Sequence, residues 1–405
     1  MTNDDHHYLA ALIAKIGSTS PAFDEDVRVA FDEDGHVIKL NLGALHLAAL
    51  PDELWQLTHL RELLLYDNQL REIPPAIAML SQLRLLSLQG NTFHSLPPEL
   101  SRLTFLETLK LQRNSLSEVP LVVTRLPSLK TLDLSYNQLH LLPPHVEQMR
   151  SLEVLNVMRN ELHSLPKEMG RVDNLRILNL SYNQFQHVPL SLCHLSRLQK
   201  LDLSSTPLTY LPAEIGQLTS LEALWLAQTL IAGLPTEIGQ LIALQSLSLE
   251  QTRLGHLPQS FWHLPNLLVL DLGWNELGSL SSEIGHLCNL RRLFLPSTNL
   301  RELPDEFWEL SHLEILGLHG NRLTTLPAGI GRLSNLQDLD VSYNELTALP
   351  PTMKYLHNLR ELVLAADNMP SLRFPPPEII EEGHTAVVTY LREQHGEDTP
   401  DNTDM

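Results

Sequence analysis

The sequence is short of cysteine, of basic residues and of long apolar runs, and each shortage excludes a class of protein. Two cysteines among 405 residues are too few for a disulfide framework. There are 28 Lys and Arg against 48 Asp and Glu, so the formal net charge is −20. A surface this acidic repels phosphate backbones and anionic lipid headgroups. We therefore expect neither nucleic acid nor a membrane surface as a partner.

The first residues lack the pattern of a secretory signal. Residues 1–7 are acidic where a signal peptide is basic, and Lys15 interrupts the short apolar stretch Tyr8–Ile16. No apolar run approaches the roughly 18 residues that a transmembrane helix needs. We therefore predict a cytoplasmic location.

A 23-residue repeat occupies most of the chain. The pattern within a unit is L-x-x-L-x-L-x-x-N-x-L-x-x-L-P-x-x-I-x-x-L, and it is clear between Leu129 and Met149. Self-similarity at such a period is typical of a solenoid. Fourteen full units and a partial one follow each other without insertion or deletion, and they open at Val37, Leu60, Leu83, Leu106, Leu129, Leu152, Leu175, Leu198, Leu221, Leu244, Leu267, Leu290, Leu313, Leu336 and Leu359.

Each part of the unit predicts a local structure. Leu132 and Leu134 alternate with Asp133, which is the period of a short strand with leucines inward. Stacked units turn these strands into a parallel sheet. On the return leg, as in Pro212–Ile215, we expect a short α or 3-10 helix with Pro at its first helical position. The helical side is wider than the strand side, so the coil should curve with the sheet on its concave face.

A polar column should satisfy the backbone where the chain leaves each strand. An Asn side chain there can donate to and accept from backbone groups of neighbouring turns, which would be costly to leave unsatisfied. Thr206, Thr229, Thr252 and Thr298 replace Asn and offer one donor, which predicts a thinner ladder. The predicted ladder consists of Asn68, Asn91, Asn114, Asn137, Asn160, Asn183, Asn275, Asn321 and Asn344.

The repeat also places the two cysteines. Cys193 and Cys288 fall in repeats four steps apart, which at a strand spacing of ~4.8 Å separates them by roughly 19 Å. That exceeds the ~7 Å Cα limit for a disulfide. Two thiols outside any disulfide are typical of a reducing cytoplasm.

The units resemble the leucine-rich-repeat family over about residues 37–372. They are most similar to its 23-residue L-P-x-x-I-G-x-L subtype, found in Ras-interacting scaffold proteins, plant intracellular Ras-group proteins and bacterial Roco proteins. The resemblance implies an α/β solenoid, a horseshoe with a parallel concave sheet and a short helical (α or 3-10) convex side. It also implies a non-catalytic scaffold that binds a protein, with a small GTPase or another signalling protein as a candidate.

The two ends differ from the repeats, as solenoid ends must if the core is to be covered. Residues 1–36 should form a cap with a helix and a hairpin, and residues 373–395 a helical cap. Residues 396–405 are acidic and have no apolar anchor, which predicts a disordered tail. The segment Pro375–Gly383, with Tyr390–Glu393, resembles the joint between repeats and GTPase domain in Roco proteins.

Outward aromatic residues are the candidate partner-binding sites, because the core does not need them. Trp225 and Phe294 lie at outward strand positions between small neighbours, namely Ser246 and Ser248 for Trp225 and Gly273 and Gly317 for Phe294. An alternative remains open at this point, in which each aromatic ring only packs over its neighbours. The predicted concave set is Trp225, Phe294, Arg292, Trp274, Tyr182, Tyr136 and Tyr343.

Charge along the outward positions is uneven. At these positions, basic residues outnumber acidic ones between Leu106 and Leu221, and acidic residues outnumber basic ones between Leu221 and Leu359. We expect a partner whose basic part lies over the C-terminal half, although a solvated surface with accidental asymmetry would give the same pattern.

The sequence predicts no active site. The 19 histidines lack the local spacing of a metal site, so we expect no metal and no cofactor. Asp133, Asp202, Asp271 and Asp340 recur every 69 residues and would stand roughly 14 Å apart, too far for a catalytic pair. No phosphate-binding loop occurs, and we expect no small-molecule substrate. Two alternatives to a plain scaffold are a regulatory or sensor subunit of a GTPase or kinase system and an effector delivered into a host cell.

Overall fold

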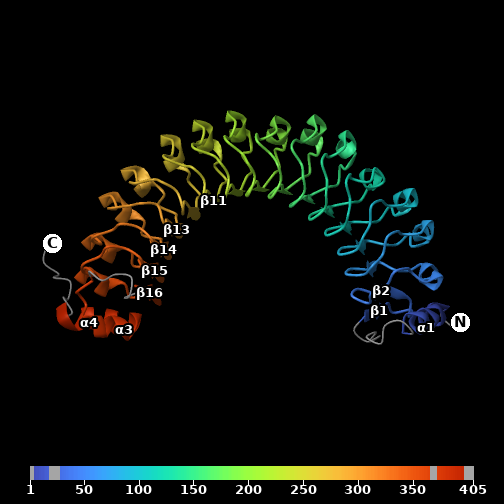
Figure 1. Cartoon of the computed structure of the whole chain (residues 1–405), viewed down its shortest axis with the longest axis horizontal. Coiled ribbons are helices and arrows are strands. Elements are labelled where there is room, and N and C mark those ends of the chain that lie inside the picture. The colour runs from blue at the N-terminus through green and yellow to red at the C-terminus, as the bar shows by residue number, and fades with distance from the viewer. Residues whose placement is uncertain (1–3, 18–27, 365–371, 396–405) are drawn as a thin grey trace. The chain divides into compact units, whose positions relative to one another are not determined.

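The computed structural model describes residues 4–17, 28–364 and 372–395. The chain divides into two compact units, Met1–Thr206 and Pro207–Met405. Within each unit, short strands line the inner side of the curve and short 3-10 helices lie on its outer side (Figure 1). This is the predicted fold class, an α/β solenoid with a parallel sheet, and the helices on its outer side are of the 3-10 rather than the α type.

The strands of unit 1 follow the chain order. The unit contains β1 (Val29–Phe31), β2 (Val37–Asn41), β3 (Glu62–Leu64), β4 (Leu85–Ser87), β5 (Thr108–Lys110), β6 (Thr131–Asp133), β7 (Val154–Asn156), β8 (Ile177–Asn179) and β9 (Lys200–Asp202). Strand β1 pairs with β2 antiparallel, and the later pairs are parallel. Gly35, with a φ of 80°, lies in the turn of the β1–β2 hairpin.

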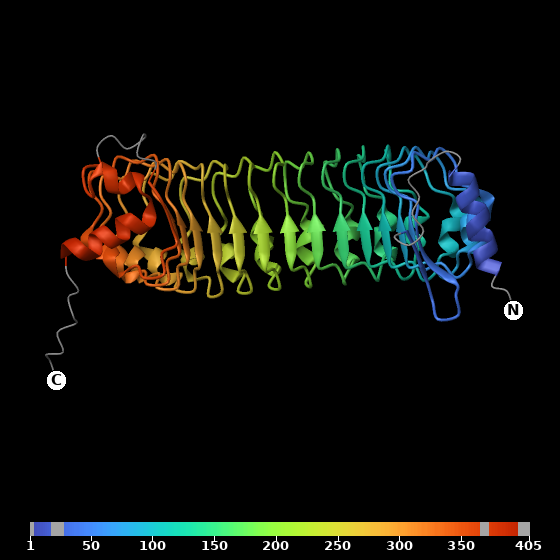
Figure 2. The same cartoon turned by 90° about the horizontal axis from the view of Figure 1, so that it is seen from below.

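The strands of unit 2 are all parallel to their neighbours. They are β10 (Ala223–Trp225), β11 (Ser246–Ser248), β12 (Val269–Asp271), β13 (Arg292–Phe294), β14 (Ile315–Gly317), β15 (Asp338–Asp340) and β16 (Glu361–Val363). Figure 2 shows the arrows of this unit side by side and pointing the same way. The register follows from the constant period, since each residue pairs with the one 23 positions later, as Leu270 does with Leu293.

Within the described residues, fourteen 3-10 helices cover the outer sides. Unit 1 contains η1 (Asp52–Gln56), η2 (Pro75–Met79), η3 (Pro98–Arg102), η4 (Val123–Arg125), η5 (Pro144–Gln148), η6 (Lys167–Arg171) and η7 (Leu190–His194). Unit 2 contains η8 (Ala213–Gln217), η9 (Thr236–Gln240), η10 (Gln259–His263), η11 (Ser282–His286), η12 (Asp305–Glu309), η13 (Ala328–Arg332) and η14 (Pro351–Tyr355).

The proline of the Leu-Pro pair is not the first helical residue, and that prediction was wrong. Pro212 has φ −72° and ψ 157°, so it is the extended N-cap of η8. Its carbonyl accepts the first helical hydrogen bond, from Ile215 N at 3.1 Å. Proline suits this position because its ring holds φ near −65° while ψ stays extended. At η11 Ser281 replaces Pro, and its side chain accepts a hydrogen bond from Glu283 N.

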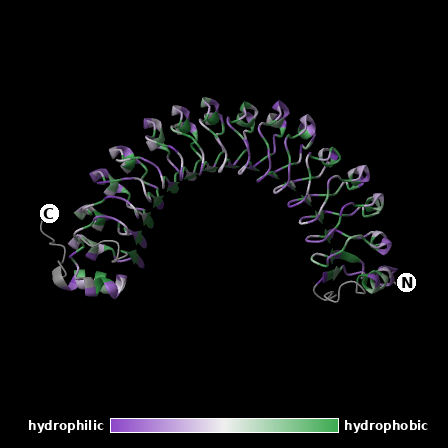
Figure 3. Cartoon of the chain, in the orientation of Figure 1, coloured by the Kyte–Doolittle hydropathy of each residue, from purple (hydrophilic) through white to green (hydrophobic). Residues whose placement is uncertain are grey.

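The core of each unit lies between strands and 3-10 helices. In a typical repeat, Leu132 and Leu134 of the strand are buried with Val146 of the helix. Hydrophobic and hydrophilic residues alternate along each coil (Figure 3). Burying a leucine side chain contributes roughly 1.5–3 kcal/mol, and the constant period repeats this contribution at the same positions in every coil.

Each Asn of the column bonds to the backbone of its own coil and of the preceding coil. Asn321 Nδ2 donates to Leu295 O at 2.7 Å and to Leu318 O at 2.8 Å, and its Oδ1 accepts from Leu300 N at 3.0 Å. Bonds of the same kind are made by Asn68, Asn91, Asn114, Asn137, Asn160, Asn183, Asn275 and Asn344.

The threonine substitutions leave fewer such bonds. Thr229 Oγ1 donates to Leu226 O within its own repeat. Thr298 Oγ1 donates to Leu295 O and lies 3.0 Å from Asn321 Oδ1 of the next repeat. A hydroxyl has a single proton to donate, so each of these threonines satisfies fewer backbone groups than an Asn does.

Helices cover both ends of the described chain. In unit 1, α1 (Asp4–Gly17) packs Leu9 and Leu12 against the first coil, and Asp5 Oδ2 accepts from Val37 N at 2.9 Å. In unit 2, α3 (Pro377–Glu381) and α4 (His384–His395) lie beside β16, and Val387 and Leu391 are buried. Figure 1 shows both ends. Residues 396–405, the predicted tail, lie outside the described residues.

Two further expectations concern membranes and disulfides. Within the residues that the structure describes, no helix is both long and apolar enough to cross a membrane. Cys193 is buried and Cys288 is exposed, and no disulfide joins them.

Candidate functional site

A shallow groove lies on the concave face of unit 2, over β13 to β16. Its volume is about 260 Å³. Phe294, Ile315 and Val363 line it from outward strand positions, and carboxylates stand among them. The lining residues are Phe294, Pro296, Ile315, Leu316, Gly317, His319, Asp338, Leu339, Asp340, Glu361 and Val363. We call this surface the unit 2 groove.

Phe294 forms an apolar wall of the unit 2 groove on its β13 side. It is half-buried at the end of β13, where its Cα partners are Asp271 on β12 and Gly317 on β14. The prediction that Gly273 flanks Phe294 was wrong. Gly273 follows the strand, and the space where its side chain would lie is filled by Pro296. A Cβ atom on Gly317 would lie 3.3 Å from Phe294 Cδ1, so the ring leans over this glycine.

Trp274 and Tyr343 stand in the turns beside the unit 2 groove, three repeats apart. Both residues have positive φ, 57° and 53°, and both are exposed, at 55% and 57%. At a strand spacing of ~4.8 Å the two turns are roughly 14 Å apart. The same column holds Ser297 and Gly320 between them, so no large side chain fills the gap. The two rings therefore form an aromatic rim.

Negative charge lies across the groove from the apolar wall, on β15 and β16. Asp338, Asp340 and Glu361 line the unit 2 groove, and His319 Nδ1 lies 3.4 Å from Asp340 Oδ2. Arg292 is exposed at the start of β13, where it pairs with Ile315, but it does not line the groove.

Asp271, beside Phe294, is in an unfavourable setting for an ionised carboxylate. Burial raises the pKa of Asp271, and the nearby charge of Glu250 raises it further, while a hydrogen bond from Gly273 N opposes the shift. Asp271 Oδ1 accepts that bond at 2.9 Å. A perturbed carboxylate beside a half-buried aromatic residue at a groove is typical of a functional surface.

Trp225 lies outside the unit 2 groove. It is half-buried at the end of β10 and pairs with Ser248, as expected. Three strand steps separate it from Phe294. The structure therefore keeps the two residues apart and does not form a common pocket from them.

The tyrosines of unit 1 interact with arginines of the same column. The Arg159 guanidinium lies 5.2 Å from the ring centroid of Tyr136 and 5.1 Å from that of Tyr182, and Arg113 lies 5.3 Å from Tyr136. Such cation–π contacts contribute about 0.5–1 kcal/mol each at exposed sites. These contacts favour the alternative in which Tyr136 and Tyr182 pack over their neighbours.

Bases on the sheet of unit 1 are partly neutralised by Glu107. Its carboxylate binds Lys130 at 2.9 Å and Arg84 at 2.8 Å. The hydrogen bond from Lys130 lowers the pKa of Glu107, and Arg84 adds to the effect. The outward bases of this unit are therefore a weaker positive surface than their number indicates.

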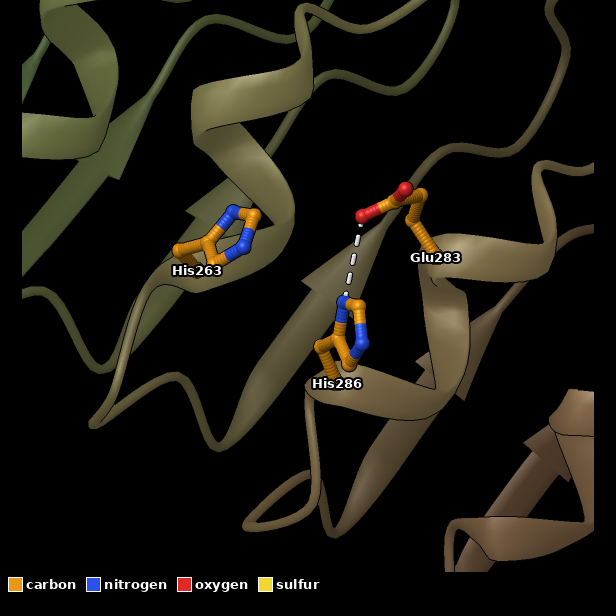
Figure 4. Close-up of side chains that lie close together, drawn as sticks. All are labelled: His263, Glu283 and His286. Carbon is orange, nitrogen blue, oxygen red and sulfur yellow. Dashed lines mark ion pairs between the residues drawn. The ribbon is translucent and has the colours of Figure 1, made fainter.

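The structure also brings together residues that local sequence spacing did not connect. His263 on η10 lies beside Glu283 and His286 on η11 (Figure 4). His263 and His286 are 23 residues apart, which is one repeat. A search for residues at this period, instead of within a few positions, would have found the cluster.

Comparisons with known proteins decide the family. A model of a leucine-rich repeat region matches residues 76–164 and 269–382, and a leucine rich repeat model matches residues 150–208 and 219–277. A leucine-rich-repeat protein of Leptospira interrogans is 36% identical and covers 81% of this chain and 84% of that chain, with a TM-score of 0.79. The chain belongs to the leucine-rich-repeat family.

Two receptors have a similar leucine-rich-repeat structure. The plant peptide hormone receptor RGFR1, in complex with RGF2, is 30% identical over 83% of this chain, with a TM-score of 0.61. A TDR receptor is 28% identical over 78%, with a TM-score of 0.62. The present leucine-rich-repeat chain spans 59% and 61% of these receptor chains. The comparison with curated proteins found no match. None of the matching family models describes a catalytic domain.

Proposed function

We propose that this leucine-rich-repeat chain is a non-catalytic protein-interaction module whose unit 2 groove binds an extended segment of another protein. The segment would place an apolar side chain on Phe294 and a basic residue among the carboxylates. The observation that carries the proposal is the combination of an apolar wall, an exposed aromatic rim and three groove carboxylates on one face.

The size of the unit 2 groove favours a protein side chain over a small molecule. Sites for drug-sized ligands usually have volumes of about 300–1,000 Å³ and bury most of the ligand, whereas this groove has about 260 Å³ and is shallow. Trp and Tyr are common anchors of protein interfaces, and Trp274 and Tyr343 expose most of their rings beside it.

Charge supports a basic partner. Asp338, Asp340 and Glu361 can bind a Lys or Arg side chain across the groove from the apolar wall, and charge-assisted hydrogen bonds to carboxylates are stronger than neutral ones. Arg292, just outside the groove, disfavours a second basic residue over β13. The partner should therefore carry its positive charge toward β15 and β16.

The likeness to RGFR1 supports a peptide-like occupant, since that receptor is in complex with RGF2. The repeat spacing favours the 23-residue subtype, and with it a cytoplasmic scaffold for a signalling protein such as a small GTPase. The closing segment with α3 and α4, which resembles the Roco joint, favours a second candidate function as a regulatory subunit of a GTPase system.

Peptide display on the full chain tests the proposal. Selected peptides should combine Lys or Arg with a nearby apolar residue, and Phe294→Ser should weaken their binding by about tenfold or more, as expected for an interface anchor. Ile242→Ala is the matched control, because Ile242 is an apolar residue of the same unit that is 58% exposed beyond η9. Equal binding by the Phe294→Ser and Ile242→Ala variants would contradict the proposal.

A further inference from the structure

A convergent group of three metal-ligand side chains lies on the outer side of unit 2. His286 Nδ1 is 3.1 Å from Glu283 Oε2, and the rings of His263 and His286 have centroids 5.3 Å apart. One possible ligand atom from each residue lies within 4.8 Å of the others. Figure 4 shows the Glu283 carboxylate and the His286 ring directed toward each other, with the His263 ring on the neighbouring coil.

The donor set suits a borderline transition metal. Two imidazoles and a carboxylate are common zinc ligands, at about 2.0–2.2 Å from the ion. Ligand atoms around such an ion stand closer together than 4.8 Å, so small side-chain rotations are needed. His263 and His286 are exposed and Glu283 is half-exposed, so these rotations meet little steric resistance.

Neighbouring groups orient two of the ligands. His263 Nδ1 lies 3.2 Å from the carbonyl oxygen of Gln259. When Nδ1 donates its proton to that carbonyl, Nε2 is left as the metal ligand, the usual role of an outer partner. The backbone of Glu283 is held by the Ser281 side chain, which accepts a hydrogen bond from Glu283 N at 3.2 Å.

A further carboxylate lies close to the cluster. Glu309 is the next residue of the column that contains His263 and His286, one repeat along the chain. Its Oε2 lies 3.0 Å from the place of a Cβ atom on Gly285, which is adjacent to His286. Its negative charge favours a cation here, and a water can complete a fourth coordination position.

We propose that His263, Glu283 and His286 bind one zinc-type divalent transition metal and thereby join the successive coils η10 and η11. Zn²⁺, Co²⁺, Ni²⁺ and Cu²⁺ fit this nitrogen-rich set, whereas Mg²⁺ and Ca²⁺ prefer oxygen ligands. A bound ion stabilises the folded state in which its ligands converge, and it does so at the repeat where Ser281 replaces the usual proline.

The other convergent group among the described residues is a weaker candidate. Asp32, Asp34 and His36 lie in the β1–β2 turn. Asp32 Oδ1 already accepts hydrogen bonds from His36 N at 2.8 Å and Asp34 N at 3.1 Å. These bonds use the carboxylate to hold the turn, so a metal would have to displace them.

Metal titration of the full chain tests the site. After treatment with a chelator and buffer exchange, ZnCl₂ is titrated by calorimetry and CoCl₂ by visible absorption. We expect the wild type to bind one metal ion per chain tightly, a strong equivalent in the titration. Zn²⁺ should raise its melting temperature, and Co²⁺ should give the visible absorption bands of an ion with nitrogen and oxygen ligands. The double variant His263→Ala/His286→Ala should lose that equivalent, and Glu283→Gln should weaken it by about tenfold or more.

A matched histidine pair separates this site from general binding to surface histidines. His140 and His163 are also exposed and 23 residues apart, and Glu161 lies 3.4 Å from His140. In the part of the chain that the structure describes, they do not belong to either convergent group. His140→Ala/His163→Ala should retain the strong equivalent. The proposal would be overturned if both double variants lost the tightly bound metal ion or if both retained it. It would also be overturned if the wild type bound no metal ion tightly.

Discussion

The ring of Phe294 lies over the backbone of Gly317, and a Cβ atom on Gly317 would approach Phe294 Cδ1 to 3.3 Å. Because Gly317 occupies an outward strand position, its missing side chain opens the centre of the unit 2 groove. The glycine therefore determines how much of the aromatic face a partner can reach.

Gly317→Ile should block binding to the unit 2 groove without unfolding the chain. The new side chain would project from the sheet and occupy the space beside Phe294, while the φ of Gly317 lies outside the left-handed region, so the backbone is not strained. Peptides selected on the wild type should bind at least about tenfold more weakly, as expected when an anchor pocket is filled. The control is Gly255→Ile, since nothing lies within 4 Å of a Cβ atom there. Equal loss in both variants would indicate that the groove is not the binding surface.

Asn321→Ala should destabilise unit 2. It removes the donor to Leu295 O and Leu318 O and the acceptor for Leu300 N, and these groups are buried. Unsatisfied buried groups cost about 1–3 kcal/mol each, partly recovered by relaxation, so we expect a loss of about 2–4 kcal/mol in the free energy of unfolding. Urea denaturation measures it.

Two further variants test whether the destabilisation by Asn321→Ala comes from the loss of buried hydrogen bonds. Asn321→Thr keeps one donor and should cost less than Asn321→Ala. Asn335→Ala removes the exposed bond from Nδ2 to Ser311 O at 2.8 Å and should cost little. If Asn335→Ala destabilised the chain as much as Asn321→Ala, burial would not be the source of the effect.

Asp271→Asn should stabilise the folded chain at neutral pH. Because burial raises the pKa of Asp271 above 3.8, the folded state binds its proton more tightly than the unfolded state. Stability from this group is then fully present at low pH and is lost as pH rises from 3.8 through the folded pKa. Asn removes this loss and can still accept the bond from Gly273 N.

Melting temperatures of wild type and Asp271→Asn, measured from acid to neutral pH, provide the test. The variant should have a higher melting temperature than the wild type at pH 7. This difference in melting temperature, the gap, should disappear toward pH 3. Glu250→Gln removes the like charge that adds to the shift, so it should reduce the gap without abolishing it. If the difference in melting temperature grew toward acid pH, the pH dependence would have the opposite sign, and the prediction would be refuted.

Arg159→Met should weaken unit 1 while leaving partner binding unchanged. The Arg159 guanidinium contacts the rings of both Tyr136 and Tyr182, and losing two exposed cation–π contacts should cost about 1 kcal/mol. Thermal unfolding monitored by circular dichroism would detect this change. Arg176→Met, at an exposed position beside β8, is the control. Lost peptide binding in Arg159→Met would instead place the binding surface in unit 1.

The sequence predicted the repeated elements well, because each depends on local alternation and on a constant period. Leu132 and Leu134 are buried on one side of β6, and Asn137 bonds backward to the preceding coil. The role of Pro212 was harder to predict from the sequence, because a single ψ angle decides whether a proline caps a helix or is its first residue. The site was only partly predictable. Phe294 lines the groove, while the register places Asp271 beside it and not Gly273.

From the sequence alone, the 23-residue period determines that residues one repeat apart become neighbours, and the leucine pattern determines which side of each coil is buried. Only the tertiary structure decided which outward side chains meet. It placed Tyr136 against Arg159, left Trp274 exposed, and brought His263 to His286. The physical reason is that burial of leucines is set by periodicity, whereas contacts between exposed side chains depend on rotamers, charges and the space that neighbours such as Gly317 leave open.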